Sequence, residues 1–311
     1  MSAVSAREPR PRWRDSDLVY AFRRSPVAQV SLLVSLLLFG AALAASLIAP
    51  YNVVDPSVAN VIDARLAPGA TGLMGERYWL GTDPLGRDLA SAMIFGLRTS
   101  LVVGIGSVLL AASIGIALGL VSGYLGGWVD AAIMRLADVQ LSFPAILIAL
   151  MVDGIARTVL DREHHEAAAV PILIVAIGAS YWVQYARTVR GVTLAERGKD
   201  YIGAATVTGV STPTILGAHI LPNVAGPVLV IATINLALAI LTEATLSFLG
   251  VGVPPTQPSL GSLVRIGNEF LFSGDWWISL LPGAVLVVLS LAVNLLGDWL
   301  RDTLNPRLGI L

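Results

Sequence analysis

The chain has 311 residues, of which 55% are hydrophobic and 13% are charged, about half the charged share of a typical soluble protein. The mean hydropathy is +0.76, and 20 basic and 21 acidic residues give a formal net charge of -1. These values exclude a disordered chain, a soluble helical bundle and a basic nucleic-acid-binding protein, so we expect no nucleic-acid partner. They favour a polytopic membrane protein.

Six segments are apolar over the roughly 20 residues that a membrane-spanning helix needs. Because lipid cannot satisfy backbone polar groups, we expect these spans to be helices and the fold to be all-α. In chain order they are residues 30–49, 99–122, 131–152, 167–186, 224–248 and 276–297. The first span has an alternative interpretation as a cleaved signal peptide, but its long apolar run and long charged leader favour a retained anchor.

An even number of spans places both termini on one side of the membrane. Twelve Arg and Lys residues lie on that side, against seven in the longer segments on the other side. The positive-inside rule therefore predicts cytoplasmic termini. The predicted organisation is a cytoplasmic tail at 1–29, a first transmembrane helix at 30–49, a periplasmic segment at 50–98, a five-helix core at 99–300, and a second cytoplasmic tail at 301–311.

Glycines recur every four residues at the end of the second span, at Gly115, Gly119, Gly123 and Gly127. Small residues at this spacing let two helix backbones approach closely. We expect them to serve packing inside the chain, with a subunit interface or a moving contact in a transport cycle as the alternatives.

Polar residues near the inner ends of two spans are expected to be structural. Arg135 and Asp138 lie three apart in the third span, where a central charge costs about 2.5–3.5 kcal/mol, so we predict that they form an ion pair rather than contact a substrate. Pro144 should kink the same span. Asn294 and Asp298 are four apart near the end of the sixth span and are expected to tie that helix end to its neighbours.

Glu243 lies deeper in the membrane and has no basic neighbour one helical turn away, so it must face protein or water. It is either a proton or cation site, as in a secondary carrier, or a polar contact that fixes helix packing. We favour the second interpretation, because Thr242, Thr245 and Ser247 are near enough to share hydrogen bonds.

Two kinds of site are not expected in this chain. It has no cysteine, which excludes disulfides, thiolate metal sites and a cysteine nucleophile. His164 and His165 are adjacent, and neighbouring residues on a helix do not face one another, so we expect a solvated loop pair and no metal site. We predict neither catalytic residues nor a bound cofactor.

The segment between the fourth and fifth spans contains two short predicted helices. The first covers about 201–210, and the second begins at an N-cap in Ser211-Thr212-Pro213, runs to about Ile220 and ends before Pro222. This helix-turn-helix would lie on the cytoplasmic face. Its small residues favour a partner that packs closely; they are Ala204, Ala205 and Gly209.

The chain has no phosphate-binding loop of its own. Its one lysine, Lys199, follows Gly198, but Asp200 replaces the hydroxyl that would hold magnesium, and no glycine precedes at the required spacing. If transport is driven by ATP, the ATPase is another chain.

The segment at about 196–222 resembles the EAA loop of ABC importer permeases through Ala204-Ala205-x3-Gly209 and Ile220-Leu221-Pro222. In that family the loop forms a coupling helix that docks in a cleft of the ATPase. Gly203 stands where many members have Glu, which removes a charge contact at that position. The resemblance implies these coupling residues: Tyr201, Gly203, Ala204, Ala205 and Gly209, with Leu221 and Pro222 setting the return of the loop.

Four further stretches resemble the "C"-type subunit of the dipeptide, oligopeptide and nickel permeases. They are Trp79-Leu80-Gly81-Thr82-Asp83-x2-Gly86-Arg87-Asp88, Gly123-Tyr124-x-Gly126-Gly127-Trp128-x-Asp130, Glu243-Ala244-x-Leu246-Ser247-Phe248-Leu249-Gly250, and Asn294-Leu295-x-Gly297-Asp298-x-Leu300-Arg301-Asp302. Asn305-Pro306-Arg307 resembles the usual Asp-Pro-Arg of the family. The matches run in order from about residue 79 to 308.

This resemblance implies a type I ABC importer permease fold in the cytoplasmic (inner) membrane of a bacterium or archaeon. The implied partners are a similar "B"-type permease, two ATPase subunits that carry ATP and magnesium, a periplasmic or lipid-anchored substrate-binding protein, and membrane lipid. Di- or oligopeptides are the default cargo, with nickel chelates, opines or related solutes as alternatives.

Three other functions compete with this interpretation. The first is an ion-coupled secondary transporter that uses Glu243. The second is a structural or signalling membrane protein without cargo. The third stays in the family but does not serve import, as in a peptide-resistance system.

Overall fold

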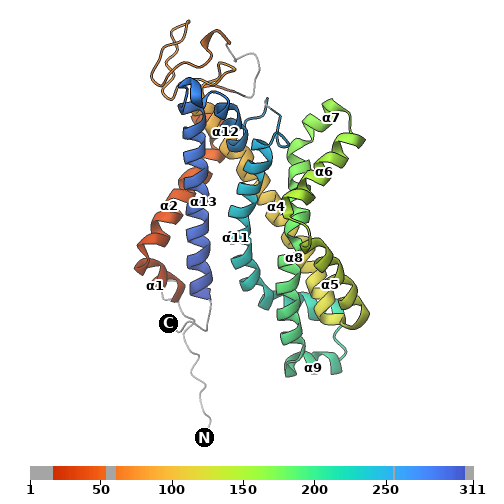
Figure 1. The fold of residues 1–311 in the computed structure, drawn as a ribbon. Coiled ribbons are helices and arrows are strands. Elements are labelled where there is room, and N and C mark those ends of the chain that lie inside the picture. The colour runs from red at the N-terminus through yellow and green to blue at the C-terminus, as the bar shows by residue number, and fades with distance from the viewer. Residues whose placement is uncertain (1–16, 54–60, 255, 305–311) are drawn as a thin grey trace.

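The computed structural model describes residues 17–53, 61–254 and 256–304, and these residues form a helical bundle without strand elements (Figure 1). The described chain begins with α1 (Asp17–Arg24), α2 (Pro26–Leu43) and α3 (Ala45–Ile48), and α4 (Leu89–Leu125) follows a segment that contains the short 3₁₀ helix Val61–Asp63. Next come α5 (Gly127–Leu141), α6 (Ala145–Val159), α7 (Arg162–Ala167), α8 (Ala169–Arg197) and α9 (Asp200–Val207). The remaining helices are α10 (Thr212–Thr214), a π-helical segment (Ile215–Ile220), α11 (Leu221–Phe248), α12 (Leu260–Asn268) and α13 (Trp277–Leu304).

Five of the predicted spans are confirmed as helices long and apolar enough to cross a membrane: α2, α4, α8, the run Thr212–Phe248, and α13. The third predicted span is broken more sharply than a kink: it consists of two helices, α5 and α6, bent by 93° at the break, and only the two together are long and apolar enough to count as a sixth span. Pro144 occupies the N-cap of α6. Proline lacks the N–H that an uninterrupted helix would need there, so the break falls at its position.

Pro222 does not end the helix before the fifth span, contrary to prediction. It lies in the first turn of α11, directly after a π-helical segment, where the hydrogen-bond pattern of the helix changes. The π-helical segment Ile215–Ile220 joins α10 to α11 without a break. The fifth span is therefore continuous with the second short helix of the inner segment.

α4 and α8 form the most extensive helix pair of the bundle, and glycines make this packing possible. A Cβ atom at Gly115 would lie 2.4 Å from the Cβ of Tyr185, and one at Gly119 would lie 2.6 Å from a backbone oxygen of α8. Gly123 faces the next turn of α8 at similar distances. The prediction of internal packing is confirmed for these three glycines. Gly127 instead has a φ of +57° and open space around it, so it serves the turn between α4 and α5.

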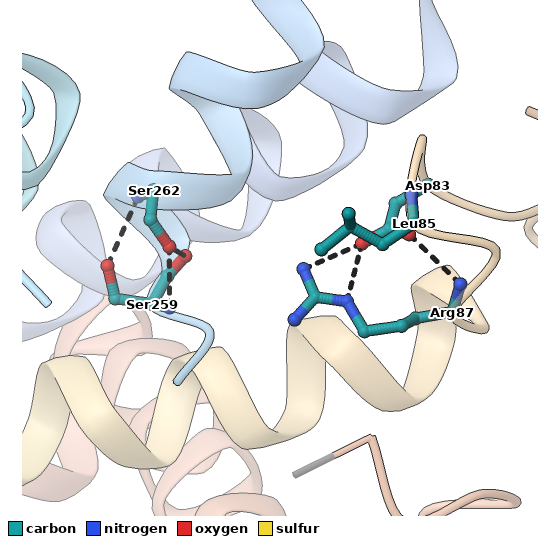
Figure 2. Close-up of polar contacts among 5 residues, drawn as sticks. All are labelled: Asp83, Leu85, Arg87, Ser259 and Ser262. Carbon is teal, nitrogen blue, oxygen red and sulfur yellow. Dashed lines mark hydrogen bonds and ion pairs between the residues drawn. The ribbon is translucent and has the colours of Figure 1, made fainter. Parts of the chain in front are cut away.

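At one end of the bundle, residues 61–88 form a compact structure that we call the outer cap (Figure 1). An ion pair buried in it links Asp83 and Arg87, whose side chains are 0% and 5% exposed. Arg87 Nε donates to Asp83 Oδ2 at 2.7 Å, and the backbone N–H groups of Leu85 and Arg87 donate to Oδ1, each at 2.9 Å (Figure 2). Asp88 then caps α4 by accepting from the N–H of Ser91 at 2.8 Å.

Two further residues of the same motif hold the chain in its turns. The Thr82 hydroxyl donates to the backbone oxygen of Asp63 at 2.5 Å and accepts from the N–H of Leu66 at 2.8 Å. Gly81 has a φ of +82°, and a Cβ there would lie 2.4 Å from the Leu66 oxygen, so only glycine fits. The stretch from Trp79 to Asp88 therefore builds the cap and starts α4.

The opposite end of the bundle carries α1, α9 and the last turn of α13 (Figure 1). The first and last described helices meet there through an edge-to-face contact between Phe22 and Trp299, with ring centroids 5.4 Å apart. α1 and the end of α13 thus lie at the same end of the bundle, which fits six spans when the bent pair of α5 and α6 is counted as one.

Candidate coupling site

Residues 196–222 connect α8 to α11 at the end of the bundle opposite the outer cap, and we call them the coupling elbow. α9 forms its first arm (Figure 1). Gly209, with a φ of +81°, turns the chain between α9 and α10. The second arm begins at Ser211, which occupies the predicted N-cap position, although its hydroxyl contacts Thr214 Oγ1 at 2.8 Å rather than a backbone N–H.

A polar network around Glu196 holds the elbow together. Lys199 Nζ donates to Glu196 Oε1 at 2.6 Å, and the Tyr201 hydroxyl donates to Glu196 Oε2. Asn223 Nδ2 donates to the Tyr201 oxygen at 3.3 Å, and the His219 ring stacks on the tyrosine ring with centroids 6.5 Å apart. The hydrogen bond to Glu196 raises the pKa of Tyr201. The network joins the end of α8, the start of α9 and the start of α11.

The inward side of α9 is apolar and packs on the second arm. Ile202 and Ala205 are 2% and 9% exposed and belong to a cluster with Ile215, Ile220 and Val224. Ala205 is therefore buried within this chain, and its side chain supports the position of α9. Of the two alanines of the motif, Ala204 is the one on the surface.

The outward side of α9 presents small and apolar residues. Gly203 and Ala204 are exposed, and Val207 is 88% exposed. A Cβ added at Gly203 or Gly209 would meet no heavy atom within 4 Å. At these two glycines no side chain of this protein keeps another molecule away from the backbone. Of the other predicted coupling residues, Tyr201, Leu221 and Pro222 are also exposed.

Glu196 of the elbow and Asn223, the residue directly after it, were missed by the sequence analysis. The spacing of Glu196 and Lys199 on one helical face was the available signal, because side chains three apart on a helix meet. Nothing local links Asn223 to Tyr201, because the pair forms only when the chain turns back on itself.

Glu243 is fully buried and lies at a junction of three helices. It accepts hydrogen bonds from Ser100 of α4 at 2.6 Å and from Ser247 at 2.7 Å. The Ser100 hydroxyl in turn accepts from the N–H of Leu260, at 3.4 Å, in the first turn of α12. These contacts match the packing interpretation rather than an ion site. Thr242 and Thr245 were predicted to share hydrogen bonds with Glu243. This prediction was wrong, since the hydroxyl groups of both donate to backbone oxygens of α11.

α12 is tied closely to this junction. Its capping box pairs the Ser259 N–H with Ser262 Oγ at 2.9 Å and the Ser262 N–H with Ser259 Oγ at 3.1 Å (Figure 2). A Cβ at Gly261 would lie 2.4 Å from the backbone oxygen of Ala244. The helix therefore rests directly on the backbone of α11.

The predicted pair of Arg135 and Asp138 does not form. Asp138 Oδ1 accepts instead from Arg187 Nη2 of α8 at 2.5 Å, between two half-exposed side chains. Arg135 has no ion-pair partner in the part of the chain that the structure describes. α5 packs along α8, so a guanidinium of the neighbouring helix reaches Asp138.

Asp298 does not tie α13 to another helix, contrary to prediction. It is exposed, and its ion-pair partner is Arg301 on the same helix, at 3.7 Å. Asn294 is half-buried, and its side chain makes no hydrogen bond to the described residues. The contact of Trp299 with Phe22 holds this helix end instead.

The predicted solvated loop pair was wrong in two respects: both histidines lie in α7, and only His164 is exposed. His165 is buried, and its Nε2 lies 3.1 Å from Asp153 Oδ1. Arg157 also pairs with Asp153, at 2.6 Å. Burial follows because α7 folds back onto α6, which sequence spacing does not reveal.

The apolar helices and the glycine-packed core together define a class, that of multi-pass membrane proteins. Comparison with known proteins gives the family. Residues 115–310 match the family described as "Binding-protein-dependent transport system inner membrane component". Residues 12–68 match the N-terminal TM domain of oligopeptide transport permease C.

Similar curated proteins are transport permeases. The dipeptide transport system permease protein DppC of Haemophilus influenzae is 35% identical over 93% of both chains. The oligopeptide transport system permease protein OppC of Mycobacterium tuberculosis is 34% identical over 93% of both. The di/tripeptide permease protein DppC of Pseudomonas aeruginosa is 36% identical over 93% of this chain and 90% of its own.

This chain belongs to the family of binding-protein-dependent transport system inner membrane components. It is a permease subunit of an ABC importer and has the type I permease fold. The family resemblance predicted from the motifs is confirmed.

Proposed function

We propose that this permease conducts di- or oligopeptides across the cytoplasmic membrane and couples their passage to ATPase subunits through the coupling elbow. The observation that carries the coupling is the outward face of α9, where Gly203 and Ala204 are exposed beside Val207. The names of the similar proteins support the cargo class. Nickel chelates, opines and related solutes are the competing cargoes.

The proposed complex contains a second, "B"-type permease, two ATPase subunits that bind ATP and magnesium, and a periplasmic or lipid-anchored binding protein. Both termini and the elbow would lie in the cytoplasm, where the arginine-rich tail belongs by the positive-inside rule. The shared location of α1, α9 and the end of α13 supports this orientation (Figure 1). The outer cap would then face the binding protein.

The contacts of the elbow transmit a displacement of α9 to two membrane-spanning helices, α8 and α11. The Glu196 network links α9 to the end of α8 and, through Asn223, to the start of α11. The apolar cluster around Ile202 joins the same elements. When ATP binding draws the ATPases together, α9 moves and takes α8 and α11 with it. Such rigid-body movement between two states opens the path alternately to either side.

An ion-coupled carrier using Glu243 is the alternative function, and it is not favoured. The carboxylate is buried and hydrogen-bonded to two serines. Such a carrier would continue uptake without the ATPases and stop when an uncoupler alone is added.

The substitution Ala204→Arg tests the docking proposal. Ala204 is exposed within a regular helix, so a long charged side chain adds bulk to the docking face without backbone strain. We expect the variant to reach the membrane with its partner permease but to lose ATPase co-purification and peptide uptake. Gly209→Arg should have the same effect, but the positive φ of Gly209 adds strain, which makes Ala204 the cleaner site.

Ala67→Arg in the outer cap is the matched control, because Ala67 is also exposed and lies at the opposite end. It should retain ATPase co-purification. Normal ATPase binding and normal uptake by the Ala204→Arg complex would contradict the proposal.

A further inference from the structure

A cavity of about 250 Å³ lies near the outer end of the bundle. Its walls come from the first turns of α4, from the start of α8 at Val170, and from the loop that precedes α12. Most of the lining is apolar, including Phe95 and Val102. Three polar side chains also line the cavity: Arg98, Thr99 and Gln257. The Thr99 hydroxyl donates to the backbone oxygen of Phe95 at 3.2 Å.

The side chains of Arg98 and Gln257 have no partner within the described residues. Arg98 is exposed and forms no ion pair there, and the Gln257 amide forms no side-chain hydrogen bond. Among other arginines at this end, Arg87 is paired with Asp83 and Arg157 with Asp153. Arg77 and Arg265, like Arg98, form no ion pair with the described residues, but neither of them lines this cavity. A cation without a counter-charge at the edge of an apolar span marks a candidate functional site.

The chemistry of the cavity suits one end of a peptide. A guanidinium offers five N–H donors in a plane and matches the two oxygens of a carboxylate. The cavity is smaller than the roughly 300–1,000 Å³ of pockets that enclose whole small ligands. It therefore has room for a terminal residue, with the carboxylate at Arg98 and an apolar side chain against Phe95 and Val102.

A peptide that enters the membrane path needs a positively charged partner for its carboxylate. Its carboxylate loses water on entry, and a buried charge is costly unless it is paired and hydrogen-bonded. We propose that Arg98, assisted by Gln257, binds the C-terminal carboxylate of the cargo as the cargo leaves the binding protein. This inference rests on the proposed function and assigns a cargo contact within it.

The test uses the complete complex in proteoliposomes, with its binding protein, and two peptides that differ only in a free or amidated C-terminus. The measured quantity is the ratio of their uptake rates. Selection by the binding protein is the same for every permease variant, so it cancels when ratios are compared. We expect Arg98→Gln to lower this ratio about tenfold by slowing the free acid, the effect of losing one charge-assisted contact. Arg98→Lys should retain part of the preference.

Arg162→Gln is the matched control, because Arg162 lies at the same end, its side chain is 93% exposed, and its partner is Glu166 of its own helix. This variant should leave the ratio unchanged. Gln257→Leu provides a second variant from another element and should lower the ratio by a smaller factor. A photo-crosslinking residue at Val102 should capture the free-acid peptide during turnover.

Two outcomes would overturn the inference. An unchanged ratio in Arg98→Gln and in Gln257→Leu would exclude a carboxylate contact. Equal slowing of both peptides, seen in vesicles with anionic lipid but not in vesicles of zwitterionic lipid, would assign Arg98 to an anionic lipid headgroup instead.

Failure of the proposed function is distinguishable from these results. In that case the wild-type complex itself would show no ATP-dependent peptide uptake, whatever residue stands at position 98. If the wild type transports peptides and the Arg98→Gln ratio does not change, only the cargo contact fails.

Discussion

The outer cap and the coupling elbow are both short segments between long helices, but they differ in how much of their surface is packed within this chain. In the cap, the Asp83 carboxylate is fully buried and accepts from Arg87 and from two backbone N–H groups. In the elbow, one side of α9 is packed while Gly203 and Ala204 remain on the surface. The cap is complete within this chain, whereas the elbow has a finished inner side and an open outer side that another subunit can cover.

Asp83→Asn should have the largest effect on stability, because it removes the carboxylate charge from a buried ion pair with Arg87. Losing one member of a buried pair costs about 3–5 kcal/mol. We expect little protein in the membrane and a strongly lowered thermal midpoint of the purified permease. Asp298→Asn is the control, since Asp298 is exposed and such pairs contribute about 0–1 kcal/mol. Equal midpoints for the two variants would show that the cap does not depend on its buried pair.

Two glycine substitutions compare the packing at the two ends. Gly261→Ala would place a Cβ 2.4 Å from a backbone oxygen of α11, and such overpacking costs about 1–3 kcal/mol. Gly203→Ala adds a Cβ in open space within a helix, where alanine is favoured over glycine by up to about 1 kcal/mol. Thermal unfolding should show a loss for the first and no loss for the second. A destabilised Gly203→Ala permease, measured without ATPases, would mean that the elbow surface is not open.

Tyr201→Phe should have the smallest effect, a slight decrease in stability, because the lost hydroxyl joins a half-exposed network. Hydrogen bonding to Glu196 raises the pKa of Tyr201. A raised pKa means that the contribution is present below the ordinary tyrosine pKa of about 10 and is lost as pH rises through the higher value. The difference in thermal midpoint between wild type and variant should therefore be constant near neutral pH and shrink in strong alkali. A difference that grows with pH would contradict this assignment.

The sequence predicted local motifs, but it did not predict the contacts that these motifs make with residues outside them. The run from Trp79 to Asp88 was recognised as a family motif, but its role in shaping the cap depends on Asp63 and Leu66, which the motif does not contain. The small residues of the elbow were found, yet the sequence did not separate Ala204 from Ala205. That distinction depends on which side of α9 meets the cluster around Ile215.

The sequence by itself determined the helical membrane class, five of the spans, the glycine-based packing and the elbow, because span length, apolar runs and motif spacing are properties of consecutive residues. Only the tertiary structure decided that Asp138 pairs with Arg187, that Glu243 is held by Ser100, and that α5 and α6 diverge by 93°. Each of these depends on which helices become neighbours. A charged or polar side chain takes the partner that the neighbouring helix brings within reach, and sequence distance does not specify that helix.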